Sequence, residues 1–328
     1  MSLEISVPGS ICELGYRIGP LLYTPGLRTD IAEKIAEYSR LGLKSAAICL
    51  EDTVRDDLVE AAEKNAVKEI KRFAREYPGS DVNIFIRVRK PSQIGSLTDI
   101  PGLAGIIKGF IIPKIDDMTI RDYMAAADVV RGAGLCLMPI LENPSLLDIC
   151  GREKRLGSLR ESLLSMSDCI ANVRLGGNDL CSGMGIVSPV SRTIYDIPPI
   201  AGLLSDIAAA LTPHFIVSAP VWNYFGGDKS GAWRAGMERE LETDRLMGFV
   251  GKTIIHPCQI APAIEAMKVS RQDYSDALAV VASKDNEIQV IKGGSSDGSR
   301  MLEAKVHMKW AEKILRLGKI YGIKGEGQ

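Results

Sequence analysis

The length, composition and charge of this chain exclude several classes of protein. It has 328 residues, of which 46% are hydrophobic and 25% charged, which is the composition of a globular protein with a large apolar core. Its 40 basic and 41 acidic residues give a formal net charge of −1. Because no basic field is available to hold a polyanion, we expect neither nucleic acid nor a membrane surface as a partner.

The cysteines and the first residues indicate the compartment. The seven cysteines include no C-x-x-C pair, and several lie inside apolar runs, where a free thiol behaves as a small hydrophobic side chain. The first twenty residues carry Glu4 and no basic-then-apolar signal, and no run reaches the ~18 apolar residues of a membrane span. We therefore expect a protein of the reducing cytoplasm.

Eight short apolar runs follow a leader that we expect to be irregular. Each run predicts a strand buried on both faces, because its apolar residues do not alternate with polar ones. In chain order the runs are residues 20–24, 45–50, 83–86, 109–112, 135–142, 169–175, 214–219 and 250–255.

Helical patterns separate most of these runs, and charge alternates with helical spacing over residues 145–167. The first of these helices has Thr29 in position to be its N-cap. The expected helices are residues 29–40, 57–76, 117–131, 199–211 and 233–247.

The alternation of strands and helices predicts an α/β fold with a parallel sheet. Eight such units within about 240 residues are typical of a (β/α)8 TIM barrel rather than an open sheet. We place the barrel in residues 1–260. Residues 261–328 are more polar, with a Gly/Ser turn at 293–298 and a helix from about 300 to 318, and they predict a C-terminal helical lid over the barrel mouth or a neighbouring subunit.

Polar residues stand at the C-terminal ends of the predicted strands. In a TIM barrel these ends share one face, on which active sites are found. A strand that meets water ends on a polar residue in any case, but acids and bases at successive ends favour a shared site. The residues concerned are Glu51, Asp52, Arg87, Lys114, Glu142, Asp179 and His256.

Two of these carboxylates, Glu142 and Asp179, have no nearby Cys or His ligands and predict a hard oxygen site. Mg²⁺ suits such a site, because it takes one or two carboxylates and leaves its other positions to water and substrate. Arg87 offers a planar fork for a substrate carboxylate. A metal ion and an arginine would together hold an α-keto or α-hydroxy acid, and the metal would stabilise an enolate. The alternative is that Glu142 and Arg87 form a simple ion pair across the barrel mouth.

The other motifs are weaker evidence of function. Residues 248–253 end like a phosphate loop, but Leu246 occupies the position of the required first glycine. The three histidines are too scattered for a zinc motif, and His256 could serve either the scaffold or the site. Trp222, Tyr224 and Phe225 either pack in the core or line a substrate pocket.

At these same positions the sequence resembles the CitE-like family, which comprises citrate lyase β-subunits, malyl-CoA lyases and relatives in the HpcH/HpaI aldolase superfamily. The resemblance covers about residues 20–310. It rests on an ordered set of motifs: Leu22-Tyr23-Thr24-Pro25-Gly26, Leu50-Glu51-Asp52-Thr53-Val54, Arg87-Val88-Arg89, Ile112-Pro113-Lys114, Leu141-Glu142 and the stretch from Gly248 to Ile260. The ending, with Met301-Leu302-Glu303, is similar to a divergent branch of C–C bond lyase-like proteins.

The resemblance implies a Mg²⁺-dependent barrel in which Glu142 and Asp179 hold the metal and Arg87 holds the substrate carboxylate. It also implies a homo-oligomer, a trimer or hexamer, in which the lid of one subunit brings an acid, here Glu303, to the next subunit's site. We assign a catalytic role to Arg87, Glu51, Asp52 and Glu303, and a substrate-binding role to Arg87, Lys114, Gly177, Asn178 and Pro220. The chain departs from the family at Cys49, Arg89, Glu303 and Asn143-Pro144.

We therefore expect a Mg²⁺-dependent C–C bond lyase or aldolase that acts on a small hydroxy-acid carboxylate or its CoA thioester. One alternative is a different reaction on the same metal site, either thioester hydrolysis or phosphoenolpyruvate-type chemistry. The other is a non-catalytic ligand-binding barrel. Product analysis distinguishes the first alternative from a lyase, and a measurement of Mg²⁺ affinity distinguishes the second.

Overall fold

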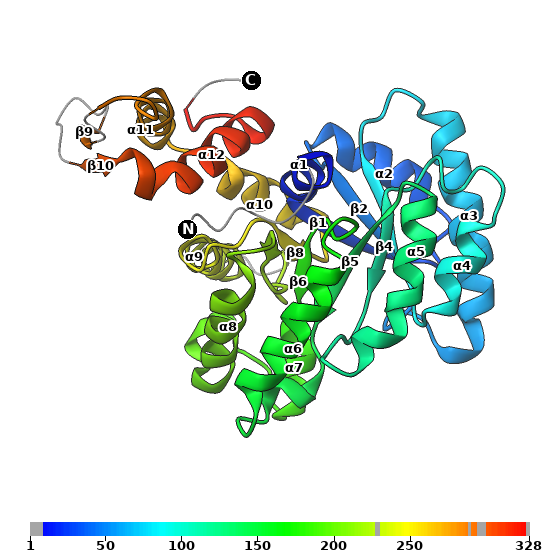
Figure 1. Ribbon diagram of the computed structural model, residues 1–328. Helices are drawn as coiled ribbons and strands as arrows, with labels where there is room; N and C mark the ends of the chain where they lie inside the picture. Colours follow the sequence, from blue (N-terminus) through cyan, green and yellow to red (C-terminus); the bar gives the residue numbers. More distant parts are fainter. Residues whose placement is uncertain (1–8, 227–229, 288–289, 294–299, 326–328) are drawn as a thin grey trace. The chain divides into compact units, whose positions relative to one another are not determined.

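A barrel of eight parallel strands is the centre of the fold (Figure 1). The computed structural model describes residues 9–226, 230–287, 290–293 and 300–325. Each strand pairs with its neighbour in the sequence, and β1 also pairs with β8. A parallel bridge between Ala219 and Lys252 joins the end of β7 to β8 and closes the ring. The predicted TIM barrel is therefore confirmed.

All eight predicted strands are present, and most are buried over their whole length. The last three are shorter than the apolar runs that predicted them. The strands are β1 Pro20–Pro25, β2 Ser45–Cys49, β3 Asn83–Arg87, β4 Gly109–Ile112, β5 Cys136–Leu141, β6 Val173–Leu175, β7 Val217–Ser218 and β8 Lys252–Ile254.

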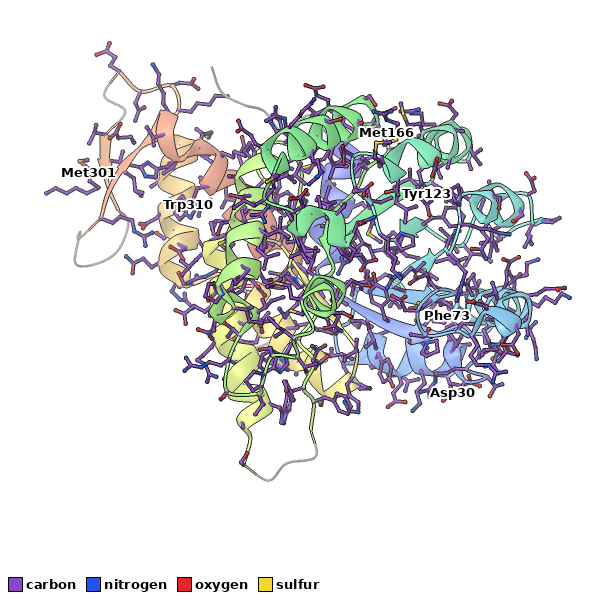
Figure 2. The ribbon with its side chains drawn as sticks, turned by 90° about the horizontal axis from the view of Figure 1, so that it is seen from below. Asp30, Phe73, Tyr123, Met166, Met301 and Trp310 are labelled. Atoms are coloured by element: carbon purple, nitrogen blue, oxygen red, sulfur yellow. The ribbon has the colours of Figure 1, made fainter. Side chains whose placement is uncertain are left out.

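Helices between the strands form an outer layer around the barrel (Figure 1). Phe73 on α3 and Met166 just after α6 are buried beneath this layer (Figure 2). The helices are α2 Ile31–Arg40, α3 Val59–Glu76, α4 Ser92–Thr98, α5 Met124–Gly132, α6 Arg152–Ser165, α7 Gly177–Gly183, α8 Pro198–Leu211, α9 Ala232–Leu246 and α10 Ile260–Met267. Short 3₁₀ turns are η1 Asp56–Leu58, η2 Thr119–Tyr123, η3 Pro144–Leu147, η4 Ile194–Asp196 and η5 Pro257–Gln259.

The expected irregular leader is wrong, because residues Gly9–Ile18 form helix α1. Ile18 and the partly buried Ile11 and Leu14 join the core cluster inside the barrel. The approach is close, since a Cβ added at Gly15 would lie 2.2 Å from the carbonyl oxygen of Ala171. Helix α1 therefore packs against the end of the barrel at which the strands begin.

Four further helices and one cap also differ from the sequence prediction. Helices α4 and α7 were not predicted, because each is only seven residues long and lacks a clear apolar period. Helix α10 and the helix Arg271–Ala282 were not predicted either. The N-cap of α2 is Asp30 rather than Thr29, and its side chain makes no capping hydrogen bond.

The chain divides into two compact units, residues 1–263 and residues 264–328. Helix α11 (Arg271–Ala282) packs on α12 (Ala304–Tyr321), and β9 (Val290–Lys292) pairs antiparallel with β10 (Met301–Glu303). The core of the second unit contains Ala277, Val280, Leu302 and Ala311, with Trp310 packed against them. Trp310 and the exposed Met301 are labelled in Figure 2.

Helix α12 begins four residues later than predicted, because residues 301–303 are paired in a strand. Most of the predicted Gly/Ser turn at 293–298 lies outside the described residues.

Candidate active site

The ends of strands β2 to β6 bring six of the predicted site residues into one cluster. Glu51 and Asp52 come two and three residues after the end of β2, and Arg87 is the last residue of β3. Lys114 and Glu142 follow β4 and β5, while Asp179 lies in the first turn of α7, after β6. Parallel strands in a closed barrel deliver these residues to one face, as the sequence predicted.

Arg87 binds three carboxylates through one nitrogen. Its Nη2 lies 2.8 Å from Glu51 Oε2, 3.0 Å from Asp52 Oδ2 and 2.8 Å from Glu142 Oε1. Burial by itself would lower the pKa of Arg87, but Glu142 and Glu51 raise it above the usual value. The ion pair between Glu142 and Arg87 that was weighed as an alternative is therefore present, as part of a larger network.

Lys114 is the second cation of the cluster. Its Nζ lies 2.7 Å from Glu51 Oε1 and 2.8 Å from Asp52 Oδ1, and 3.9 Å from Asp179 Oδ1. Its φ of +53° is the only positive value at a non-glycine position in the described chain. In this strained conformation its backbone N–H donates to Glu142 Oε1 at 3.1 Å. Lys114 thus contacts the site through both its backbone and its side chain.

Glu142 is only 2% exposed, and its two oxygens have different surroundings. Oε1 accepts hydrogen bonds from Arg87 and from the backbone of Lys114, whereas Oε2 has no hydrogen-bond partner among the described residues. Burial raises the pKa of Glu142 to about 8, because Arg87 only partly offsets it and Asp179 adds like charge. A Cβ at Gly176 would lie 2.2 Å from Oε2, so glycine is needed there.

These carboxylates fit a magnesium ion. Glu142 Oε2 and the partly exposed Asp179 are oxygen donors of the kind that Mg²⁺ prefers, and the like charges of the two would be relieved by a cation. No group of three or more His, Cys, Asp or Glu suited to a metal occurs in the described part of the chain. Two carboxylates are within the number that Mg²⁺ uses, because this ion leaves its other positions to water and substrate.

Arg89, where the sequence departs from the family, holds the loop that carries Glu51 and Asp52. Its Nη2 donates to the carbonyl oxygens of Glu51, at 2.9 Å, and Val54. It also pairs with Asp56 at the start of η1. The arginine therefore holds this loop through its backbone carbonyl groups, and it makes no contact with the carboxylate groups of Glu51 and Asp52 in the described structure.

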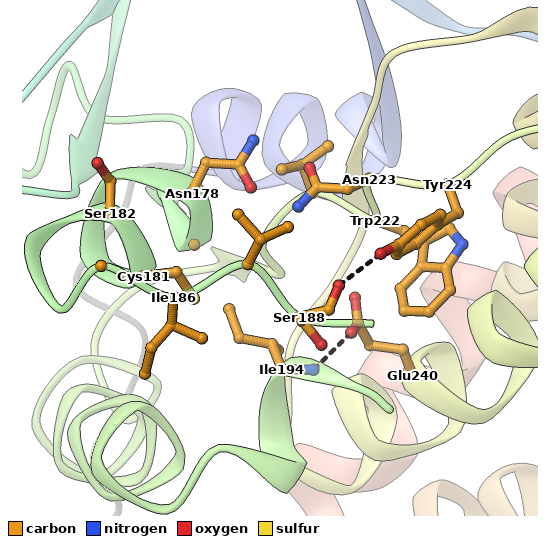
Figure 3. Close-up of a pocket in the computed structure, with 14 residues that line it drawn as sticks. Asn178, Cys181, Ser182, Ile186, Ser188, Ile194, Trp222, Asn223, Tyr224 and Glu240 are labelled. Atoms are coloured by element: carbon orange, nitrogen blue, oxygen red, sulfur yellow. Dashed lines mark hydrogen bonds between the residues drawn. The ribbon is translucent and has the colours of Figure 1, made fainter. Parts of the chain in front are cut away.

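A pocket of about 530 Å³ is lined in part by Asn178, Cys181 and Ser182 of α7, the helix that carries Asp179 (Figure 3). Its wall contains Trp222, Tyr224 and Glu240, each fixed by a hydrogen bond to backbone. Figure 3 also shows Asn178 and Asn223, whose side chains make no hydrogen bond within the described chain. The pocket thus combines a fixed, partly apolar wall with two amide groups that are available to a ligand.

The other predicted residues lie in different places. A Cβ at Gly177 would meet Pro220 at 2.9 Å, so these two residues pack on each other at the pocket edge, and Asn178 lines the pocket. Glu303 lies in the second unit, at the N-cap of α12. The His256 side chain accepts from the Cys258 backbone N–H and stacks on Phe225, which favours a scaffold role.

The sequence did not single out Tyr23 and Arg174, which lie inside the barrel. Each is one polar residue within an apolar run, and only the pairing register shows that it points inward. The register that pairs Arg174 with Ile140 places it one inward layer below Glu142.

Comparisons with known proteins identify a family and similar folds. A family model described as C–C bond lyase of the TIM-barrel fold matches residues 13–323. A (3S)-malyl-CoA thioesterase of Cereibacter sphaeroides is 26% identical over 309 residues, which cover 91% of this chain and 96% of that protein.

Two solved structures share the fold. CitE of Mycobacterium tuberculosis, in complex with magnesium, acetoacetate and coenzyme A, matches with a TM-score of 0.59 and 20% identity, over 93% of this chain and 99% of that one. A magnesium–glyoxylate complex of Haloferax volcanii malate synthase matches with a TM-score of 0.53 and 17% identity, over 74% and 73%. Every helix in the described residues is too short or too polar to cross a membrane.

Proposed function

This chain belongs to the family of C–C bond lyases of the TIM-barrel fold, in the CitE-like part of the HpcH/HpaI superfamily, and on that premise we propose that it is a Mg²⁺-dependent C–C lyase or aldolase. The proposed substrate is a hydroxy acid or its CoA thioester. The observation that carries the proposal is the cluster of four carboxylates and two cations at the ends of β2 to β6.

Each residue of the cluster has a role in the proposed reaction. Glu142 and Asp179 would hold Mg²⁺, which supplies a Lewis acid for negative charge that develops on a carbonyl oxygen. Arg87 would bind the substrate carboxylate through its planar fork. Lys114 would bind a second substrate oxygen from the open side of the site.

Glu51 and Asp52 are the proposed proton-transfer pair, because their surroundings shift their pKa values in opposite directions. Burial raises the pKa of Glu51. Burial has the same tendency at Asp52, but hydrogen bonds with the side chains of Glu51 and Lys114 hold the pKa of Asp52 below its usual value. Asp52 would therefore take the proton from the substrate hydroxyl as the C–C bond breaks, and Glu51 would donate a proton to the released fragment.

The pocket beside Asp179 is the proposed place for the larger part of the substrate. Its volume of about 530 Å³ suits an acyl chain or part of a thioester arm better than a small acid alone. The two free amides of Asn178 and Asn223 could bind amide or hydroxyl groups of such an arm. Glu303 remains the proposed lid acid, supplied by another subunit of a homo-oligomer.

Thioester hydrolysis is the second candidate, and one observation favours it. The curated relative that covers nearly the whole chain is a malyl-CoA thioesterase. Hydrolysis would need the same cation and the same carboxylate-binding arginine, with water attacking the thioester carbonyl and the CoA thiol leaving as the C–S bond breaks.

Product analysis tests both candidates. The full chain is incubated with Mg²⁺ and a panel of hydroxyacyl-CoA thioesters and free hydroxy acids, and the products are separated by mass spectrometry. A lyase yields a carbonyl compound and an acyl fragment, whereas a thioesterase yields free CoA and the intact acid. E142Q should abolish either reaction, while E60Q, on the outer surface of α3, should not. Absence of turnover with the whole panel, in both directions, would contradict the proposal.

A further inference from the structure

A second guanidinium lies inside the barrel, below the carboxylate cluster. Arg174 in β6 is 0% exposed and is among the largest fully buried side chains. Its Nη2 donates to Thr253 Oγ1 at 2.8 Å, and its Nη1 donates to Asn172 Oδ1 at 3.3 Å. Neither partner is a carboxylate, so this buried positive charge has no counter-charge among the described residues.

Several buried polar atoms around it are also without partners. Four of the six such side-chain atoms in the described chain lie in the barrel interior, namely Tyr23 Oη, Arg87 Nε, Asn172 Nδ2 and Arg174 Nε. The three nitrogens can only donate hydrogen bonds, and the tyrosine hydroxyl can also donate. A surplus of donors beside an uncompensated cation is costly in a protein interior, and an anionic acceptor relieves both.

These groups lie close together inside the barrel. Tyr23 pairs in register with Ala47, two residues before the pair formed by Cys49 and Arg87, so it lies one layer below Arg87. The centre of its ring is 6.0 Å from Arg87 Cζ. Arg174 lies close enough to interact electrostatically with both, although its contact with the Tyr23 hydroxyl lacks normal hydrogen-bond geometry.

The charge of these groups favours an anion. Tyr23 as a whole residue is only partly buried, whereas its hydroxyl is fully buried beside Arg174. In the cluster above, the charges of four carboxylates would be balanced by Arg87, Lys114 and a divalent cation. The charge of Arg174 is then left over, and it matches one negative charge on a ligand.

We propose that Tyr23, Asn172 and Arg174 form an anion subsite one layer below Arg87, which takes a carboxylate group. The substrate would then be a dicarboxylic acid, with one carboxylate at Arg87 and the other at this subsite. Only the assignment of this carboxylate to the substrate rests on the proposed function. A free carboxylate ion, such as acetate, would bind to the subsite through the same chemistry.

Calorimetric binding of small acids, at fixed Mg²⁺ and ionic strength, tests the subsite without any turnover. Dicarboxylates from oxalate to succinate are compared with monocarboxylates from acetate to butyrate. We expect at least one dicarboxylate to bind tenfold or more tightly than its monocarboxylate counterpart. R174M should remove this advantage, and R174K should keep part of it. R72M is the matched control, because Arg72 also has an unpartnered Nε but lies at the surface and pairs with Glu33 and Glu69.

The outcomes distinguish a carboxylate of the substrate from a free carboxylate ion, and they distinguish failure of the anion subsite from failure of the metal site. If acetate binding depends on Arg174 and dicarboxylates gain nothing, the subsite is supported as a place for a free carboxylate. If R174M binds every acid as the wild type does, the subsite is wrong. Unchanged Mg²⁺ affinity in R174M separates this failure from failure of the metal site. If R174M does not fold, two milder variants replace it: Y23F, which removes only a hydroxyl, and R174K. The proposal would also be overturned if both of these variants bound every acid as the wild type does.

Discussion

Lys114 shows how one residue serves the site through both its backbone and its side chain. Its positive φ turns the backbone N–H toward Glu142, and its ammonium group binds Glu51 and Asp52. A left-handed conformation is unfavourable for any residue with a Cβ and persists only where the surroundings enforce it. The strained backbone of Lys114 thus lies next to the proposed metal ligand Glu142.

Two substitutions at Lys114 measure this strain. K114G and K114A both remove the ammonium group, but only alanine keeps the Cβ that opposes a positive φ. We expect K114G to be more stable than K114A by about 0.5–1 kcal/mol in urea-induced unfolding. At Lys71, within helix α3, the order should reverse, with K71A more stable than K71G by about 1 kcal/mol. Equal stability of K114G and K114A would show that the backbone of Lys114 is unstrained.

Among single residues, the sequence predicted the charged residues at strand ends but not the polar residues inside the strands. Glu142 and Arg87 stand out because each ends an apolar run. Arg174 does not stand out, because the face to which it points depends on a pairing register that spans distant parts of the chain. The strain at Lys114 was equally hidden, since nothing in its side chain indicates a positive φ.

Helix α9 and strand β8 are joined by a buried charge network. Lys252, fully buried in β8, pairs with Glu240 at 2.8 Å and Asp244 at 2.9 Å, and Tyr195 donates to Asp244. Glu240 also lines the pocket and accepts from the Ile194 backbone. The lysine that mimics a phosphate loop in the sequence thus fixes the pocket wall.

The pH dependence of stability tests this network. Burial, with Glu240, raises the pKa of Asp244 to about 6 despite Lys252, above the ~3.9 of an unfolded chain. The folded protein therefore holds more protons than the unfolded chain between these values, and this contribution to stability is present below pH 4 and is lost as pH rises toward 6.

D244N lacks this titration. The free energy of unfolding of the wild type, minus that of D244N, should fall by up to about 2–3 kcal/mol between pH 4 and pH 6. Urea titrations at several pH values measure the difference. A difference that stays constant or rises with pH would contradict the raised pKa of Asp244.

Elements with a strong period were predictable, and short ones were not. The β/α alternation predicted every strand of the barrel and helix α3, with its buried face of Ala62, Ala66, Ile70 and Phe73. Helix α1 was missed because Gly9, Gly15 and the flanking prolines read as an irregular leader. Its spacing of Ile11, Gly15 and Ile18 becomes meaningful only once a barrel end is available to pack against.

The molecule consists of a barrel unit, which carries the carboxylate cluster, and a second unit, which carries Glu303. A site that needs an acid from the second unit of another chain would be incomplete in a monomer. The homo-oligomer, as trimer or hexamer, stays a prediction, and so does the role of Glu303.

Complementation between two inactive variants tests sharing of the site. E142Q retains Glu303 but lacks the metal ligand, whereas E303Q retains the barrel site but lacks the lid acid. If Glu303 acts on another subunit, co-expression of the two variants should restore part of the activity, because some sites combine an intact barrel with an intact lid. Activity no higher than that of either variant alone would place Glu303 in its own chain's site or outside the reaction. Sedimentation velocity gives the number of chains in each sample.

The central claim is that Glu142 and Asp179 hold Mg²⁺ at the ends of β5 and β6. Calorimetric titration of the full chain with Mg²⁺ tests it directly, alongside E142Q, D179N and the surface control E60Q. We expect one Mg²⁺ per chain, and a loss of affinity of at least about tenfold in E142Q and in D179N, since even outer groups of metal sites contribute that much. E60Q should bind as the wild type does. Wild-type affinity in both E142Q and D179N would contradict the assignment of the metal site and the mechanism that depends on it.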